Sequence, residues 1–273
     1  MVDFIKVLLW IAAFAVLFFT NLMAFWLGML LCFVYLVYKA IPLIYSIRAN
    51  AMFSEGRYRK AAELYKKANK RDNTKFNLRY YYACALMRTG DFDEAEAILN
   101  GVIRDKKRIK EADKNTARMQ RCMVYLRQGR KAEAIESATE LFESGYKNSN
   151  MYAMIGYFKI MSNEPQKSVT AFCEEAYEYN NEHRDIMDNL SICYMREGRY
   201  AEAKELSDKL MELSPTFVEA FYHGAEIALK CNDYDRAREL AKGIDSCHMS
   251  AMTTVSREEI RELKRRVGLT NQE

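Results

Sequence analysis

The sequence of 273 residues contains few turn-forming residues, with three prolines and eleven glycines. This scarcity argues against a turn-rich all-β protein and against a proline- or glycine-rich linker protein. None of the seven cysteines forms a C-x-x-C pair, which argues against a disulfide framework or a zinc ribbon and favours a reducing compartment. The net charge of +4 is too small to indicate a nucleic-acid-binding protein. Half of the residues are apolar, which is ample for a buried core.

Charge is missing from one long segment near the N-terminus. Residues 7–38 contain no Asp, Glu, Lys, Arg or His, and Thr20 and Asn21 are the clearly polar residues within them. As one helix this segment would be about 48 Å long, whereas the hydrocarbon core of a bilayer is about 30 Å thick. Two membrane arrangements fit: a helical hairpin with spans near 4–19 and 22–41, or one long tilted helix. The polar pair near the midpoint favours the hairpin.

A cleaved signal peptide is a third interpretation, because Lys6 precedes a short apolar run. A second apolar run, residues 22–38, follows without a small-residue cleavage site, and this favours a retained anchor. The membrane-proximal basic residues that follow the anchor are Lys39, Arg48, Arg57, Arg59 and Lys60. Because no such excess precedes the anchor, the positive-inside rule predicts that the rest of the chain faces the cytoplasm. The prediction is a cell-membrane protein anchored in lipid through residues 4–41.

The remainder of the chain repeats with a period near 34 residues. The turn of each repeat carries glycine or asparagine, at Gly56, Gly90, Gly129, Asn163, Gly198 and Asn232. These residue types tolerate the left-handed conformation that ends one helix and starts the next. A column of small residues follows each turn residue by five positions: Ala61, Ala95, Ala134, Ser168, Ala203 and Ala237. A second column precedes it by seven: Ala49, Ala83, Cys122, Gly156, Ser191 and Ala225. The pattern predicts closely packed helix pairs.

The 34-residue period, the G-x-[YF]-x-x-A core and the closing Pro215 resemble the tetratricopeptide repeat. The resemblance covers about residues 42–251. It implies an all-α, right-handed superhelical solenoid of six repeats that start near residues 42, 76, 115, 149, 184 and 218. In repeats 3 and 4, Lys131 and Pro165 replace the aromatic residue of the turn. In residues 252–273, Ser256 and Glu259 form a capping box that predicts a covering helix, followed by a frayed tail at 270–273.

The sequence contains no recognisable catalytic or metal-binding constellation. The three histidines lie far apart and do not form the spacing of a zinc site. Phosphate-binding glycine loops and nucleophile motifs are also absent from the sequence. We therefore expect a binding protein without catalytic residues, metal or cofactor.

The resemblance implies that partners bind in a concave groove lined by the first helix of each repeat, mainly through its fifth and ninth positions. Positions four residues apart share one face of a helix. The candidate groove residues are Tyr80, Cys84, Met119, Met123, Tyr157, Ile192 and Tyr222. Tyrosine and methionine here replace the lysine and asparagine of family members that bind chaperone tails. The groove is therefore predicted to be an adaptable apolar strip that holds peptide or helix side chains.

Charge is distributed unevenly along the repeats. Residues 48–79 carry ten basic and three acidic residues, whereas residues 133–190 carry four basic and eleven acidic residues. This uneven charge predicts that the first repeat lies on anionic lipid.

Taken together, the anchor, the repeats and the groove predict a membrane-anchored cytosolic scaffold or adaptor that binds proteins or peptides, and not nucleic acid. Two alternatives remain open: a membrane receptor for targeting signals, and a non-catalytic regulatory subunit of a membrane enzyme.

Overall fold

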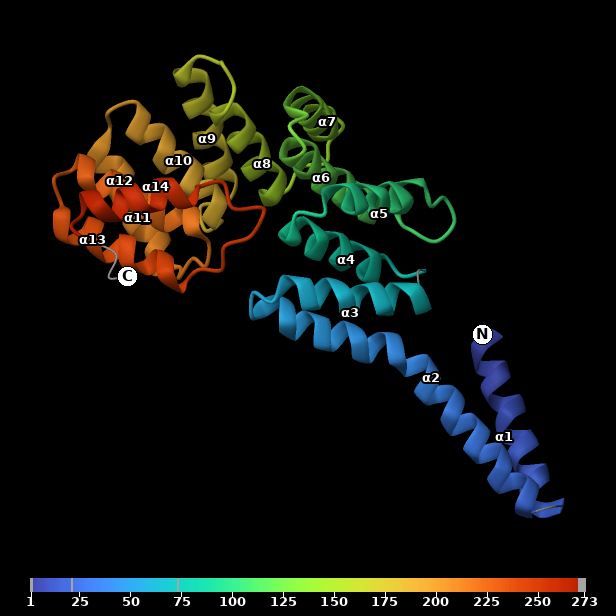
Figure 1. The fold of residues 1–273 in the computed structure, drawn as a ribbon. Coiled ribbons are helices and arrows are strands. Elements are labelled where there is room, and N and C mark those ends of the chain that lie inside the picture. The colour runs from blue at the N-terminus through green and yellow to red at the C-terminus, as the bar shows by residue number, and fades with distance from the viewer. Residues whose placement is uncertain (1, 21, 73, 270–273) are drawn as a thin grey trace.

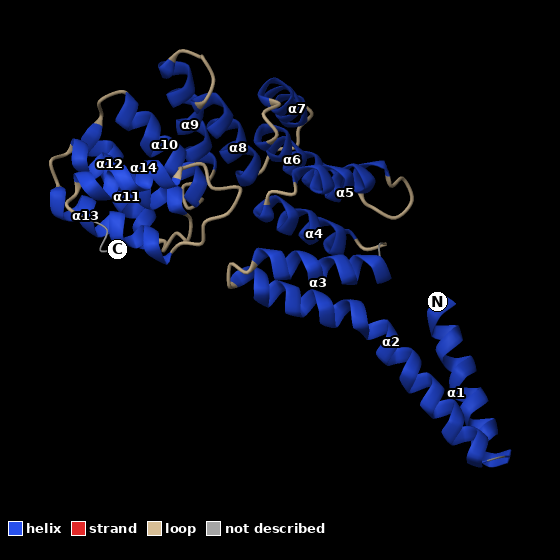
Figure 2. Cartoon of the chain, in the orientation of Figure 1, coloured by secondary structure: helices blue, strands red, loops and turns tan. Residues whose placement is uncertain are grey.

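The computed structural model describes residues 2–20, 22–72 and 74–269, and Figure 1 shows their arrangement. Over these residues every regular element is a helix (Figure 2). The helices are α1 (Val2–Thr20), α2 (Leu22–Ser54), α3 (Tyr58–Arg71), α4 (Phe76–Thr89), α5 (Phe92–Arg104), α6 (Glu111–Arg127), α7 (Lys131–Glu143), α8 (Ser149–Ile160), α9 (Gln166–Tyr179), α10 (Arg184–Arg196), α11 (Tyr200–Glu212), α12 (Val218–Lys230), α13 (Tyr234–Gly243), the 3-10 helix η1 (Ile244–Ser246) and α14 (Arg257–Arg266). The predicted all-α class is confirmed.

Consecutive helices pack in pairs, and the pairs stack into a curved solenoid (Figure 1). The second half of α2 packs with α3 as the first pair, and α12 with α13 is the last. Helix α6 begins at Glu111, four residues before the start expected for the third repeat. The extra residues of that repeat therefore lengthen both this helix and the loop before it.

Five of the six predicted turn residues adopt the left-handed conformation. Their φ angles are +71° at Gly56, +92° at Gly90, +81° at Gly129, +78° at Gly198 and +59° at Asn232. The sixth, Asn163, is not among the residues with positive φ. The turn of the fourth repeat therefore has a different shape.

That different turn shifts the register of α9 by one residue. The other second helices begin two residues after their turn residue, whereas α9 begins at Gln166, three residues after Asn163, with Pro165 at its N-cap. The prediction that Ser168 fills the small-residue position is wrong, because Ser168 is exposed and Val169 is buried in its place. The five alanines of this column, by contrast, have no exposed surface.

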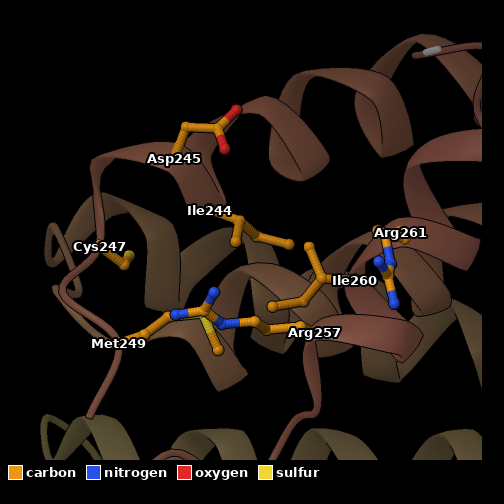
Figure 3. A pocket seen from close by; sticks show the side chains of 7 residues that line it. All are labelled: Ile244, Asp245, Cys247, Met249, Arg257, Ile260 and Arg261. Atoms are coloured by element: carbon orange, nitrogen blue, oxygen red, sulfur yellow. The ribbon is translucent and has the colours of Figure 1, made fainter. Parts of the chain in front are cut away.

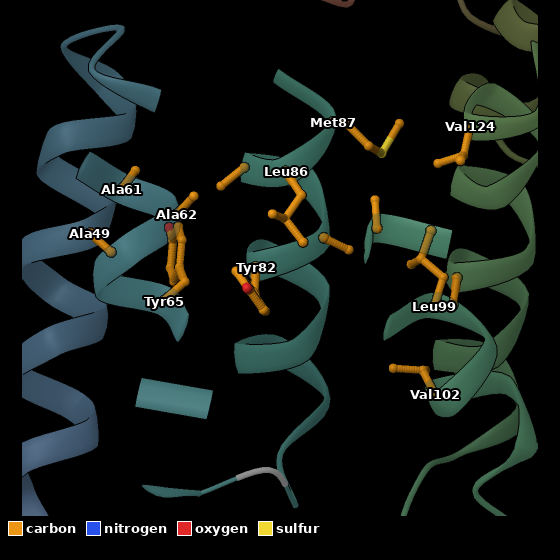
Figure 4. Close-up of a cluster of buried hydrophobic side chains, with 14 of the residues drawn as sticks. Ala49, Ala61, Ala62, Tyr65, Tyr82, Leu86, Met87, Leu99, Val102 and Val124 are labelled. Carbon is orange, nitrogen blue, oxygen red and sulfur yellow. The ribbon is translucent and has the colours of Figure 1, made fainter. Parts of the chain in front are cut away.

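The core is a series of apolar clusters between neighbouring helices. In the first cluster, side chains from α2 to α6 fill the spaces between successive helices (Figure 4). Tyr65, Leu86 and Leu99 are among its buried members. Further clusters repeat this arrangement along the solenoid. Each repeat therefore buries its apolar surface against its neighbours, as in other solenoids.

The C-terminal end of the solenoid is covered by α14. The Ser256 hydroxyl accepts a hydrogen bond from the Glu259 amide at 3.1 Å, and Glu259 Oε2 accepts one from the Ser256 amide at 2.7 Å. This is the predicted capping box. Ile260 and Leu263 of α14 are buried in the cluster of the last repeat. The tail predicted to fray, residues 270–273, lies outside the described residues.

At the N-terminal end, α2 belongs to two parts of the molecule. Its second half contributes Ala49 to the first cluster, whereas most apolar residues of its first half are exposed. No break separates the halves at the expected boundary of residues 41 and 42, although Pro42 lies inside the helix. Among the described helices, α2 is the one that is long and apolar enough to cross a membrane.

Helix α1 packs antiparallel to the first half of α2 (Figure 1). The rings of Phe14 and Phe18 meet that of Phe25 edge-on, with centroids 6.1 and 5.1 Å apart. Gly28 allows this approach, because a Cβ atom there would lie 3.0 Å from the ring of Phe14. The two helices are separated at Asn21, which lies outside the described residues.

The buried alanine column generates a prediction. Ala203 has no exposed surface, whereas Ala201, two residues earlier in α11, is exposed. Ala203→Trp should lower the free energy of unfolding by about 1–3 kcal/mol or more through overpacking. Ala201→Trp is the matched control and should have little effect. Urea unfolding followed by circular dichroism measures both, and equal losses would contradict the helix register.

Candidate partner-binding groove

The inner face of the solenoid is built from the first helices of the repeats. Helix α4 contacts α6, and α10 contacts both α8 and α12. Side chains of α6 and α8 share one apolar cluster, which connects these two groups of helices. A segment of the same chain, Cys247–Ser256, lies on this surface; we name it the strap. It connects η1 to α14 and extends toward α4 before it returns (Figure 1).

Tyr80 and Cys84 lie on α4 and are partly buried. The ring centroid of Tyr80 lies 5.2 Å from that of Phe76 and 5.6 Å from that of Tyr81. Burial raises the pKa of the Tyr80 hydroxyl and raises the pKa of the Cys84 thiol to about 11. Both groups are therefore neutral at physiological pH, and the thiol is a poor nucleophile.

Met123, Tyr157 and Tyr222 are also partly buried, which leaves part of each side chain accessible. Met123 packs against two successive apolar clusters and so bridges neighbouring repeats. Burial raises the pKa of Tyr157, although the charge of Arg127 and a side-chain hydrogen bond with Thr254 of the strap act in the opposite direction. The strap therefore lies close to the Tyr157 hydroxyl.

Two of the candidate groove residues lie in the core. Met119 is 5% exposed and Ile192 is 8% exposed. Met119 faces α8 in a cluster that includes Met151, and Ile192 faces α12 in a cluster that includes Ala220. Each points toward the next repeat, because successive first helices pack directly against one another. These two residues stabilise the solenoid and are not accessible to a partner.

The strap is the component of the groove that sequence reasoning missed. The Ala251 amide donates a hydrogen bond to the carbonyl oxygen of Arg88 at 3.1 Å. Arg127 Nη2 donates to the carbonyl oxygen of Thr253 at 3.4 Å. The Thr254 amide donates to Glu219 Oε1 at 2.6 Å. Through the strap, these bonds join α4 and α6 to α12. In two of the three bonds the partners lie more than a hundred residues apart in the sequence. A local sequence pattern therefore could not predict them.

The part of the inner face near α10 and α12 contains a buried ion pair. His223 Nδ1 lies 3.0 Å from Asp188 Oδ2, and Asp188 is 7% exposed. Burial lowers the pKa of His223, but the charge and hydrogen bond of Asp188 outweigh this effect and raise it overall. Glu219, which holds the strap, raises it further. These two carboxylates therefore stabilise the protonated form of His223 relative to that of a histidine in water.

The predicted membrane-proximal basic residues fall into two groups. Lys39 lies directly after the apolar half of α2, 5.7 Å from the ring of Tyr35. Arg57, Arg59 and Lys60 lie at the opposite end, in the turn between α2 and α3 and the start of α3 (Figure 1).

Residues 38–54 of α2 cover about 24 Å at the standard helix rise. The distance from Tyr38 to that turn is therefore more than twice the screening length of about 8 Å at physiological salt. Arg48 lies between these two ends of α2.

Antiparallel pairing of α3 with α2 instead brings other cations toward the apolar half of α2. The guanidinium of Arg71, at the end of α3, lies 5.7 Å from the ring of Tyr38. Lys70 precedes it in the last turn of the same helix. The basic residues nearest the apolar half of α2 are therefore Lys39, Lys70 and Arg71, because α3 runs back along α2.

A shallow concavity of about 400 Å³ lies between the start of the strap and α14. Ile244 and Ile260 face each other in it, with Cys247 and Met249 at its edge (Figure 3). Within the described ranges, no group of three His, Cys, Asp or Glu side chains is placed to hold a metal ion. The concavity is open and lacks such donors, so the inner face remains the main candidate for binding.

Comparisons with known proteins agree with this geometry. A family model of the tetratricopeptide repeat matches residues 52–112. A second model, described as the N-terminal TPR repeats region of psidin, matches residues 103–242, which is more than half of the chain. The search of curated proteins found no match.

Several solved structures share the fold. A tetratricopeptide repeat protein from Parabacteroides merdae has a TM-score of 0.61 and 14% identity, over 84% of this chain and 85% of that chain. PilF from Pseudomonas aeruginosa has a TM-score of 0.54 and 13% identity, over 84% and 99% of the two chains. PilW, a type IV pilus biogenesis factor, has a TM-score of 0.54 and 14% identity, over 76% and 93%. At these identities the likeness concerns the fold alone.

Proposed function

Because the chain belongs to the tetratricopeptide-repeat family, we propose that it is a membrane-anchored scaffold that binds protein or peptide partners on the inner face of its solenoid. One observation carries this proposal: a peptide segment, the strap, already lies on that face and contacts α4, α6 and α12. A surface that holds one segment of polypeptide through backbone and side-chain bonds has the chemistry to hold another.

Apolar side chains would supply much of the affinity. Tyr80, Met123, Tyr157 and Tyr222 are partly accessible on four helices of the inner face, α4, α6, α8 and α12. Tyrosine offers a large rigid surface with a polar tip, and methionine adapts its shape to its partner. Partly buried anchors of this kind lose little conformational entropy on binding, because their neighbours already restrict them.

Membrane attachment is supported by the exposed apolar surface of α1 and α2. Side chains such as Leu9, Met23 and Phe33 are more than 60% exposed, which is unfavourable in water. Tyr35 and Tyr38 follow, and tyrosine is enriched where a helix leaves the membrane. We propose that α1 and the first half of α2 form a hairpin in the bilayer, with the repeats on the cytoplasmic side. Lys39, Lys70 and Arg71 would then face anionic lipid headgroups.

A double substitution tests the groove. Met123→Glu with Tyr157→Glu places two charges where an apolar partner would lie, and truncating such anchors costs on the order of 2 kcal/mol or more. Affinity purification of the full chain in mild detergent should therefore recover markedly less partner, at unchanged helicity. Tyr200→Glu with Tyr234→Glu is the matched control, because these tyrosines are exposed on the second helices α11 and α13. Equal recovery by both variants would refute the groove.

Fractionation tests the anchor. The full chain should stay with membranes after alkaline carbonate washing, because burial of an apolar helix in lipid does not depend on charge. Residues 42–273, which keep the paired half of α2, should instead appear in the soluble fraction as a helical protein. A full chain released by carbonate would contradict the proposed spans.

A reporter fused after Glu273 tests the orientation of the chain. It should be active in the cytoplasm, and activity on the other side of the membrane would reverse the proposed orientation.

A further inference from the structure

We infer that the C-terminal ends of α4 and α6, together with Glu219 at the start of α12, form a binding site for a turn-shaped, uncharged peptide segment anchored by methionine. The strap is the resident copy of that segment, and a partner must displace it. This inference rests on the proposed function of the inner face and names the kind of partner that it accepts.

The first feature of the site is a carbonyl group at the end of α4 that has no hydrogen-bond donor within its own helix. The last carbonyl groups of an α-helix have no donor within the helix. In α4, the carbonyl oxygen of Arg88 accepts the Ala251 amide at 3.1 Å, and Arg88 Nη1 donates to the hydroxyl of Ser250 at 3.2 Å. Gly90 ends α4 beside the strap in the left-handed conformation, and a Cβ atom there would lie 3.4 Å from that of Ala251, at van der Waals contact. The end of α4 therefore binds peptide through its backbone.

The strap meets this surface as a tight turn. The Thr253 amide donates to the carbonyl oxygen of Ser250 at 3.0 Å, and the Ser250 amide donates to Thr253 Oγ1 at 3.1 Å. The Met252 amide donates to Ser250 Oγ at 3.2 Å. These internal bonds leave the Ala251 amide as the donor that reaches α4. A partner needs the same turn, with an amide directed outward at its second position.

Side-chain chemistry defines the rest of the ligand. Met252 packs against the apolar cluster that also contains Met123, so methionine is the anchor of the turn. Residues 247–255 contain no Asp, Glu, Lys or Arg, and small hydroxyl residues flank the anchor. Thr254 bonds to Glu219, and its side chain also faces Tyr157. The groove therefore selects a neutral segment with methionine between small or hydroxyl-bearing residues.

Occupancy by the strap limits access by other segments. A tethered segment competes at an effective concentration on the order of millimolar. A free partner must overcome this competition, so the closed form favours partners that present the same turn with additional contacts. Loosening the strap should expose the site, and fixing it should close the site.

A fluorescent synthetic peptide of residues 248–256 is the probe, titrated into the full chain in detergent and followed by anisotropy. Met252→Asp removes the anchor of the strap, and Ala251→Pro removes the amide that bonds to Arg88. Both variants should bind the probe about tenfold or more tightly than the unmodified chain, because competition by the tether is reduced. Met249→Asp is the matched control, since Met249 is exposed in the same segment and should leave binding unchanged.

A reversible lock supplies the opposite test. In the variant Gly90→Cys with Ala251→Cys, the two Cβ positions are close to the separation of about 3.5–4.5 Å found in disulfides. Oxidation should close the site and abolish probe binding, and reduction of the same sample should restore it. The two single-cysteine variants control for the strain of a side chain at Gly90 and for oxidation of the native cysteines.

The outcomes separate this inference from the proposed function. Equal probe binding to the oxidised and reduced lock, or no probe binding to either loosened variant, would overturn the inference. If the variant Met123→Glu with Tyr157→Glu still loses its partners in that case, the proposed function survives. Probe binding to the loosened variants, with partner recovery unaffected by that double substitution, would instead refute the proposed function alone.

Discussion

The structure depends on one constraint: each pair of helices can bury its apolar face only against the next pair. Alanines without exposed surface, such as Ala61 and Ala203, let the two helices of a pair approach closely. Because burial then runs from repeat to repeat, both ends of the array must be covered. Helix α14 covers the C-terminal end with Ile260 and Leu263. At the other end, the second half of α2 is the first helix of the first repeat and continues without a break into the apolar segment.

This arrangement connects attachment and recognition physically. The helix proposed to enter the bilayer also forms the first layer of the core, so the orientation of the solenoid is set relative to the anchor by α2 itself. The connection that leads to α14 has to pass the inner face, and its contacts with Arg88, Arg127 and Glu219 tie early repeats to the last one. The strap therefore links distant repeats and lies on the inner face of the solenoid.

Local signals in the sequence predicted the fold well. Turn residues, the columns of small residues and the Ser256–Glu259 capping box act within one or two helices, so their spacing alone defines repeats and the final helix. The register of α9 could not be predicted, since it depends on the shape of the turn before Pro165. The candidate site was predicted less well. Helix rotation buries Met119 and Ile192, the continuation of α2 to Ser54 places Arg57 far from the apolar half of that helix, and the bond between Ala251 and Arg88 joins residues with no common pattern.

Hydrogen exchange of the strap amides in the full chain tests the central claim most directly, namely that the strap occupies the inner face. The Ala251 and Thr254 amides are bonded to Arg88 and Glu219, so they should exchange about tenfold or more slowly than the same amides in the free peptide of residues 248–256. Adding an excess of that peptide to the full chain should speed their exchange as the strap is displaced. Exchange in the full chain at the rate of the free peptide would contradict the account, because the inner face would then be unoccupied.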